Sequence, residues 1–346
     1  MASSAEEHVK PRATIREVAS AAGVSIATVS RVLNGRPDVS PATREAVLRV
    51  VRDQRFATNR SARALSGGRT SLVGVTLPLV EAPYFAHILA GAAEALYEHD
   101  MRVVLSPTLH LHDRAVTLLD RLMHGTTDGA VLMLPEETND ELKSLQRLGY
   151  PFVVVDPRVA LDEGVAAVSA ANASGAHAAV QHLLALGHER VAAITGPLEW
   201  LASKERLIGY HSAHAGAGVL ADPDLVMEAD YSIAGGEVAA ARLLDLANRP
   251  TAIFALNDNM AVAVLREARK RGLRVPEDLS VVGFDDSEQA SIVTPALTSV
   301  RQPLAEMGRM AVSLLLRLIE NQSVEGLKVE LQTRLVVRDS TAPRGG

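Results

Sequence analysis

The sequence predicts an α/β protein in which a small helical head precedes two doubly wound lobes, each built on a parallel sheet. Capped helical segments occupy the stretch between residues 14 and 53. From Leu72 onward, short apolar runs alternate with helical segments, the pattern of a parallel sheet covered on both faces. The number of these strand–helix units is larger than one ordinary sheet contains, so we infer two lobes. A length of 346 residues agrees with two or three domains.

Three helices are expected in the head. Thr14 and Glu17 have the spacing of a capping box that begins the first helix, and Gly23 ends it. Ser25 can cap the second helix, and Pro41 occupies the first position of the third. Two short helices joined by a tight turn that contains glycine predict a helix-turn-helix. A generic three-helix bundle is the alternative.

The second helix carries side chains suited to reading DNA. Val29 and Val32 can pack in the core, which leaves the opposite face free. There, Ile26 and Ala27 can touch thymine methyl groups, and Arg31 can reach O6 and N7 of guanine. Short polar side chains nearby suit phosphate contacts. The predicted DNA-contacting residues of the head are Thr14, Ser25, Ile26, Ala27, Thr28, Ser30, Arg31 and Asn34.

Strands and helices alternate along the body. Strands are expected at residues 72–77, 102–105, 130–134, 152–155, 166–168, 191–195, 225–228, 252–256 and 280–283. Helices are expected at residues 84–99, 113–123, 140–148, 176–186, 203–214, 237–247 and 260–271. An apolar stripe from Leu304 to Leu318 indicates a late helix that packs in the core or between subunits.

Polar and aromatic side chains follow several of these strands. Ligands of parallel sheets bind beyond the carboxyl ends of the strands. Each side chain alone has an ordinary explanation, since Asn257 can cap a helix and Asp285 can form a turn. Their recurrence is typical of a sugar site, where polar groups bind hydroxyls and a ring stacks on the sugar. The predicted effector-binding residues are Tyr84, Phe85, Asp156, Arg206, Tyr231, Asn257 and Asp285.

Charge and composition narrow the class of protein. Residues 1–70 carry 12 Lys and Arg against 6 Asp and Glu, whereas the remaining residues carry 23 against 35. A basic head on an acidic body indicates a polyanionic partner, the alternative being a solvated basic helix. The lack of cysteine excludes disulfide scaffolds, thiolate metal sites and cysteine nucleophiles. No apolar run reaches about 18 residues and no secretory signal is evident, so we expect a cytoplasmic protein.

Several segments match the motifs of one known family. In the head they are residues 14–19, 23–25, 28–35, 39–44 and 59–65. In the body they are residues 189–197, 206–210, 257–261 and 280–286. Through these segments the chain resembles the lactose/galactose-repressor family of transcription regulators, almost to residue 340. In sugar-responsive members, the residues matching Arg206, Asn257 and Asp285 bind sugar hydroxyls, and the aromatic matching Tyr231 stacks on the sugar.

The resemblance also implies a hinge helix that folds only on operator DNA. Its leucine, here Leu65, wedges into the minor groove. A short helix that ends at Gly67-Gly68 is too short to be stable alone, and an apolar wedge beside arginines can kink DNA. The predicted DNA-contacting residues of this segment are Asn59, Arg60, Ala62, Arg63 and Leu65.

The family fold implies lobes of the periplasmic-binding-protein type that the chain crosses three times. We expect a helix-turn-helix domain at residues 1–58, a hinge helix and linker at 59–70, an N-terminal lobe at 71–168 with 303–331, and a C-terminal lobe at 169–302 with 332–340. The leucine-heptad helix of tetrameric members does not follow the last strand. We therefore expect a homodimer on near-palindromic operator DNA.

The predicted function is a sequence-specific repressor whose operator affinity is lowered by a mono- or oligosaccharide bound between the lobes. Alternatives are a corepressor-dependent regulator that responds to a non-sugar metabolite, a sugar-binding transport protein, and an enzyme. The head and the absent signal argue against transport. No nucleophile, base and orienting group are assembled, and Gly216-Ala217-Gly218 fails as a dinucleotide loop, so neither catalysis nor a cofactor is expected. The histidine pairs at 110/112 and 211/214 lack a matching carboxylate, so no metal is expected.

Overall fold

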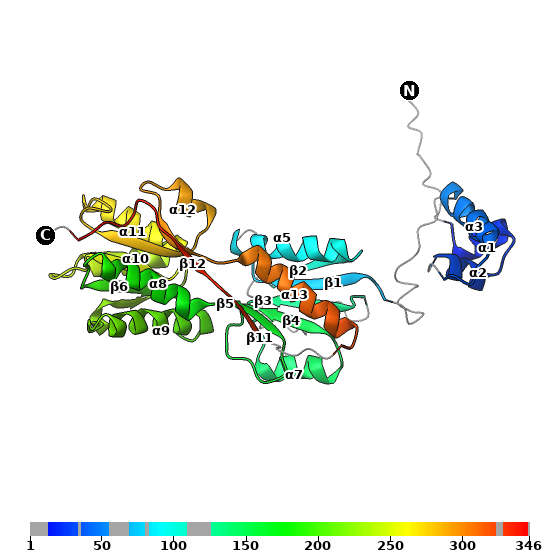
Figure 1. Cartoon of the computed structure of the whole chain (residues 1–346), viewed down its shortest axis with the longest axis horizontal. Coiled ribbons are helices and arrows are strands. Elements are labelled where there is room, and N and C mark those ends of the chain that lie inside the picture. The colour runs from blue at the N-terminus through cyan, green and yellow to red at the C-terminus, as the bar shows by residue number, and fades with distance from the viewer. Residues whose placement is uncertain are drawn as a thin grey trace, which may run out of the picture. The chain divides into compact units, whose positions relative to one another are not determined.

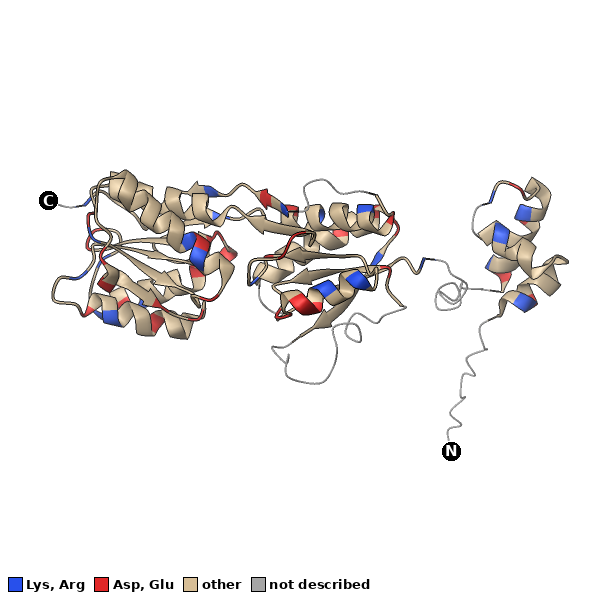
Figure 2. Ribbon diagram, turned by 90° about the horizontal axis from the view of Figure 1, so that it is seen from below, with Lys and Arg blue, Asp and Glu red and all other residues tan. Residues whose placement is uncertain are grey.

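The computed structural model describes residues 13–33, 36–54, 69–79, 83–108, 126–322 and 328–344. The chain divides into two compact units, a head (Met1–Thr70) and a body (Ser71–Gly346) (Figure 1). Lys and Arg recur along the helices of the head, and Asp and Glu are spread over the body (Figure 2). Within the described ranges, no helix has the length and apolar character needed to cross a membrane.

The described residues of the head form the three expected helices, α1 (Ile15–Ala22), α2 (Ile26–Leu33) and α3 (Pro41–Asp53). The capping box at the start of α1 is confirmed, and Gly23 ends that helix in the left-handed region with φ 66°. Val18, Val29 and Val47 are fully buried where the three helices meet. This small apolar core fixes α2 against α1 and α3.

The first lobe of the body is a parallel sheet in the order β11-β5-β4-β3-β1-β2. Its strands are β1 (Leu72–Leu77), β2 (Arg102–Pro107), β3 (Gly129–Met133), β4 (Phe152–Val155), β5 (Ala167–Ala170) and β11 (Lys328–Leu331). Alternate residues of β3 and β4 face opposite sides. One side packs against α5 (Pro83–Glu98) and α13 (Leu304–Ile319), and the other against α7 (Asn139–Arg147).

The second lobe has the order β12-β10-β9-β8-β6-β7, in which only the pairing of β12 with β10 is antiparallel. Its strands are β6 (Val191–Thr195), β7 (Val226–Glu228), β8 (Ala252–Ala255), β9 (Ser280–Asp285), β10 (Thr298–Arg301) and β12 (Arg334–Val336). Its helices are α8 (Asn172–Ala185), α9 (Leu201–Gly216), α10 (Ile233–Leu244), α11 (Asp258–Lys270) and the short α12 (Glu288–Ile292).

The chain passes between the two lobes three times, as expected. The crossings join β5 to α8, β10 to α13, and β11 to β12 (Figure 1). The carboxyl ends of both sheets therefore lie near the boundary between the lobes. The α/β fold that the sequence predicts, a helical head followed by two lobes built on mainly parallel sheets, is confirmed.

The expected elements agree with the structure except in a few places. The bounds of β1, β4 and β6 are those predicted, whereas α8 and α10 each begin four residues earlier and Leu225 lies in a 3₁₀ turn, not in β7. Four short elements, α12, β10, β11 and β12, were not predicted. The helix expected at 113–123 lies outside the described residues. The expected limit at 168/169 falls within β5, and the domain limits stay predictions.

Two glycines allow α5 and α13 to approach closely in the first lobe. A Cβ atom added at Gly91 would lie 1.9 Å from the carbonyl oxygen of Ala305, and one added at Gly308 would lie 2.1 Å from that of Ile88. Both obstacles are backbone atoms, which cannot move without displacing a helix. This contact fixes the start of α13 beside the second crossing.

Gly91→Ala is expected to lower the free energy of unfolding of the body by about 1–3 kcal/mol, because it forces the two helices apart. Gly216→Ala is the control, since nothing lies within 4 Å of the added Cβ at the end of α9. The control should be neutral or stabilise by about 0.5–1 kcal/mol. Urea unfolding of the full chain measures both, and equal effects would contradict the close contact.

Candidate functional site

The outer face of α2 presents the side chains predicted to read DNA. Ile26 is 45% exposed and Ala27 and Arg31 are also exposed, whereas Val29 and Val32 are buried. Thr28 is half-buried, and its backbone N–H donates to Ser25 Oγ at 3.1 Å, so Ser25 caps the helix as expected. Thus α2 offers an apolar start and a basic end on one accessible face.

Several of the predicted DNA-contacting side chains have intramolecular partners, and the hydroxyl oxygens of Ser25 and Thr28 lie 2.9 Å apart. Arg31 lies 3.4 Å from a carboxylate oxygen of Asp38, and both side chains are more than half exposed. Thr14 donates from its hydroxyl to Glu17 Oε2 at 3.0 Å within the capping box. Asn34 and the hinge residues 59–65 lie outside the described residues. The DNA contacts of all these residues stay predictions.

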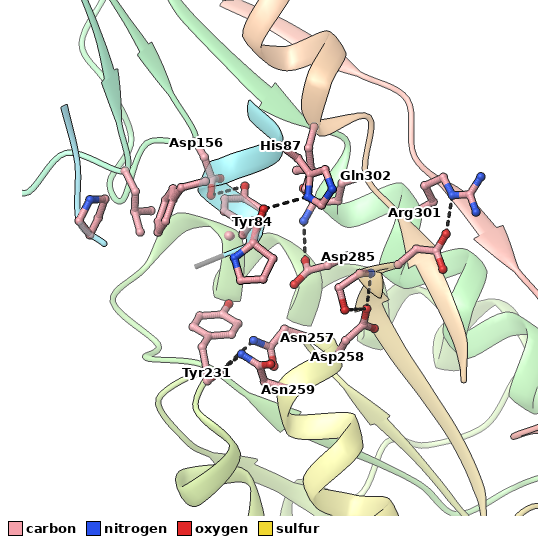
Figure 3. A pocket seen from close by; sticks show the side chains of 18 of the residues that line it. Tyr84, His87, Asp156, Tyr231, Asn257, Asp258, Asn259, Asp285, Arg301 and Gln302 are labelled. Carbon is pink, nitrogen blue, oxygen red and sulfur yellow. Dashed lines mark hydrogen bonds and ion pairs between the residues drawn. The ribbon is translucent and has the colours of Figure 1, made fainter. Parts of the chain in front are cut away.

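A cavity of about 690 Å³ lies between the two lobes of the body. Figure 3 shows Tyr84 and Asp156 on one side of it, Tyr231 and Asn257 on the other, and Asp285 between them. The structure brings together every residue that the sequence predicted for the effector site. Those lining residues are Tyr84, Phe85, Asp156, Arg206, Tyr231, Asn257 and Asp285. Their contact with an effector stays a prediction.

The polar centre of the cavity combines residues of both lobes. Tyr84, from α5, donates its hydroxyl hydrogen to Asp156 Oδ2 at 2.8 Å. Arg206, from α9, is 4% exposed, and it donates to Asn172 Oδ1 at 2.9 Å and to the carbonyl oxygen of Leu256 at 2.6 Å. Burial raises the pKa of Asp156, which the charge of Arg206 opposes.

Asp285 ends β9 with φ 109°, and its Oδ1 accepts from Gln302 Nε2 at 2.7 Å. Burial raises the pKa of this carboxyl to about 8, against the opposing charge of Arg206. Asp258 lies behind it and accepts from Ser287 and Ser299; burial raises its pKa to about 6. These carboxyl groups can accept or donate hydrogen bonds, which suits neutral hydroxyl ligands.

Asn257 and Tyr231 meet at the start of α11. Asn257 Oδ1 accepts from the N–H of Met260 at 2.9 Å and caps α11, while its Nδ2 donates to the carbonyl oxygen of Tyr231 at 2.9 Å. The cap and the cavity position therefore coincide in one residue. The hydroxyl of Tyr231 lies 2.8 Å from Ser203 Oγ, which orients the ring in the cavity wall.

Sequence reasoning missed several lining residues, above all Trp200, Arg158 and Gln302. The ring of Trp200, the single tryptophan, has its centre 5.6 Å from that of Tyr231. Its place after β6, beyond a strand end, was an available signal. No such signal pointed to Gln302, because β10 was not predicted. Within the described ranges, no three histidine, aspartate or glutamate side chains are grouped to hold a metal.

Comparison with known proteins gives matches along nearly the whole chain. The model for bacterial regulatory proteins of the lacI family matches residues 14–59, and that for a periplasmic binding protein-like domain matches residues 180–341. The HTH-type transcriptional regulator CelR of Thermobifida fusca is 39% identical, covering 95% of this chain and 98% of its own. Catabolite control protein A of Priestia megaterium is 33% identical, covering 95% and 99%.

Solved structures agree with this relationship. A transcriptional regulator CelR–cellobiose complex superposes with a TM-score of 0.72 at 37% identity, covering 95% of this chain and all of that chain. A lac repressor dimer bound to operator and the anti-inducer ONPF superposes with a TM-score of 0.84 at 29% identity, covering 95% and 99%.

Between about pH 4 and pH 8, Asp285 is expected to make the body less stable as the pH rises. Its folded pKa is raised by burial to about 8, so over this range the folded protein binds a proton that the unfolded chain has lost. The stability is therefore greatest at the acidic end and is lost as the pH rises through the folded pKa.

Asp285→Asn keeps an acceptor for Gln302 and should flatten this dependence by up to about 1.4 kcal/mol per pH unit. Asp224→Asn, on an exposed turn, is the matched control and should leave the slope unchanged. Urea unfolding across the range measures both. A wild-type slope in Asp285→Asn would show that another group carries the proton.

Proposed function

The chain belongs to the lacI family of bacterial regulatory proteins, and we propose that it is a repressor whose operator affinity is lowered by a sugar bound between its lobes. As a member of this family it is a DNA-binding transcription regulator. We propose that it acts by binding alone, in the cytoplasm, without a catalytic step. The head supplies the DNA-reading face and the body supplies the effector cavity.

The observation that carries the sugar proposal is the convergence of acceptors, a guanidinium and aromatic rings on one cavity. Its volume of about 690 Å³ lies within the usual range for small-ligand sites. Asp156 and Asp285 can bind hydroxyls, and the ring of Tyr231 offers a face for the apolar side of a sugar. Cellobiose is the first sugar to test, because the CelR structure holds it.

We also propose that the protein binds a near-palindromic operator as a homodimer. The related lac repressor structure is a dimer on operator. Among the described strands, β2 lies at one edge of the first sheet, and Leu105 on it is 37% exposed. Tyr97, on the neighbouring α5, is 73% exposed. An apolar sheet edge with an exposed ring beside it supports pairing with a second copy.

The effector is proposed to act by changing the arrangement of the lobes and, through it, the hinge helices that carry Leu65. The hinge lies outside the described residues. A ligand shifts such an equilibrium only by its differential affinity for the two states, typically about 1–3 kcal/mol. The alternative function is a regulator whose effector is a corepressor and strengthens DNA binding. In that case the effector would bind the DNA-binding state more tightly than the other state.

Arg31→Ala is expected to weaken operator binding by about 1–3 kcal/mol and to relax the preference at one base pair of each half-site, because Arg31 would pair with guanine. Arg52→Ala, at an exposed position in the last turn of α3, is the control and should retain that preference. Gel shifts on single-base operator variants measure both. If Arg31→Ala weakened the binding of all operator variants equally, Arg31 would contact phosphate and not a base.

The wild-type protein is expected to bind a neutral sugar, and Asp285→Ala to weaken that binding by about 1–3 kcal/mol, because a half-buried acceptor for a hydroxyl is lost. Calorimetry with a panel of mono- and disaccharides measures the affinity, with Asp224→Ala as the control. The bound sugar should release operator DNA in a gel shift. Tight binding of a nucleobase but of no sugar would contradict the proposal.

A further inference from the structure

One contact joins the two lobes away from the three chain crossings. Arg158 follows β4 in the first lobe, and Trp200 immediately precedes α9 in the second. The backbone N–H of Leu201 donates to the carbonyl oxygen of Arg158 at 2.6 Å. The guanidinium carbon of Arg158 also lies 4.5 Å from the centre of the Trp200 ring. The same arginine therefore meets the second lobe through its backbone and through its side chain.

The first lobe holds the Arg158 side chain in place for this contact. Arg158 Nη2 lies 2.9 Å from Glu136 Oε1, and the two side chains are 19% and 14% exposed. A charge-assisted hydrogen bond at such a half-buried position holds the guanidinium in one orientation. Because both partners belong to the first lobe, this orientation does not depend on contact with the second lobe. A cation placed over an indole face is stabilising, and more so as water is removed from the pair.

Trp200 connects this contact to the effector cavity. Its ring comes from the second lobe but packs against the apolar core of the first lobe. It also lies 5.6 Å from the ring of Tyr231, centre to centre, at an angle of 32°. Trp200, Arg158 and Tyr231 all line the cavity. A sugar held against Tyr231 would therefore lie directly beside the contact between the lobes.

We propose that Arg158 and Trp200 form a latch that holds the lobes closed around the effector, so that both set effector affinity as positioning residues. The inference rests on the proposed sugar function of this cavity. Two-lobed binding domains close around their ligands by hinge motion. For a ligand that binds only the closed state, the apparent dissociation constant is the intrinsic one divided by the fraction of molecules that are closed. Weakening the latch should therefore raise the dissociation constant by emptying the closed state.

The absence of cysteine makes a direct measurement of closure possible. Asp140→Cys and Lys204→Cys introduce two unique thiols at exposed positions, one on α7 of the first lobe and one on α9 of the second. Spin labels on this pair report the distance between the lobes by pulsed electron paramagnetic resonance. The measurement uses the full-length protein, both free and with saturating cellobiose or whichever sugar of the panel binds.

Arg158→Ala and Trp200→Ala are expected to shift the labels of the free protein to longer distances and to raise the sugar dissociation constant about three- to thirty-fold. Saturating sugar should restore the short distance. Trp200→Phe, which keeps a ring for Arg158, should lie close to wild type. Arg147→Ala is the matched control, because this exposed arginine lies at the end of α7 and bonds only within that helix in the described structure.

Unchanged label distances in the free Arg158→Ala and Trp200→Ala proteins would overturn the latch, even if the dissociation constant rose, because the residues would then contact sugar directly. Failure of the wild-type protein to bind any sugar would overturn the proposed effector class. The distances between the spin labels in the sugar-free proteins would still show whether Arg158 and Trp200 hold the lobes closed.

Discussion

The buried guanidinium of Arg206 is the interaction on which the effector cavity depends. A charge that is 4% exposed is tolerated only if its hydrogens and charge are satisfied. Asn172 and the carbonyl oxygen of Leu256 take two of its hydrogen bonds, and its guanidinium carbon lies 3.8 Å from the centre of the Phe284 ring. The carboxyl groups of Asp156 and Asp285 lie close enough to interact with its charge, and Asp285 adds a full negative charge only above its own pKa of about 8. This cation gives the cavity its polar centre.

The backbone at the cavity is held in unusual conformations by bonds from elsewhere. Asp156, Tyr231, Asp285 and Asp286 have φ values of 54°, 64°, 109° and 52°, in a region that costs non-glycine residues about 1–3 kcal/mol. Asp286 is fixed by ion pairs to Arg301, at the second crossing, and to Arg338, just after β12. The second crossing therefore also helps to hold the loop that presents Asp285.

The sequence predicted those features that depend on local patterns. Apolar runs located β1, β4 and β6, and strand ends located the effector candidates other than Arg206, because both signals lie within a few residues. Arg206 was instead found near the start of a helix. The start of α8 was missed because its cap position, Ala171, offers no side-chain bond, and that of α10 because Gly235-Gly236 weakens the helical pattern. The short strands β10 to β12 and the contact of Arg158 with Trp200 depend on the approach of distant segments, which no local pattern encodes.

In the proposed mechanism, a small ligand moves a whole lobe, and the second crossing offers a route for that movement. Gln302 bonds to Asp285 in the cavity and lies two residues before α13. That helix is locked to α5 by the contacts at Gly91 and Gly308, and both helices pack on the first sheet. Close-packed layers of this kind move together and do not bend. A displacement at Gln302 is therefore passed to the entire first lobe, including β1, the strand that follows the head in the sequence. Its effect on DNA binding is limited by the difference in effector affinity between the open and closed arrangements.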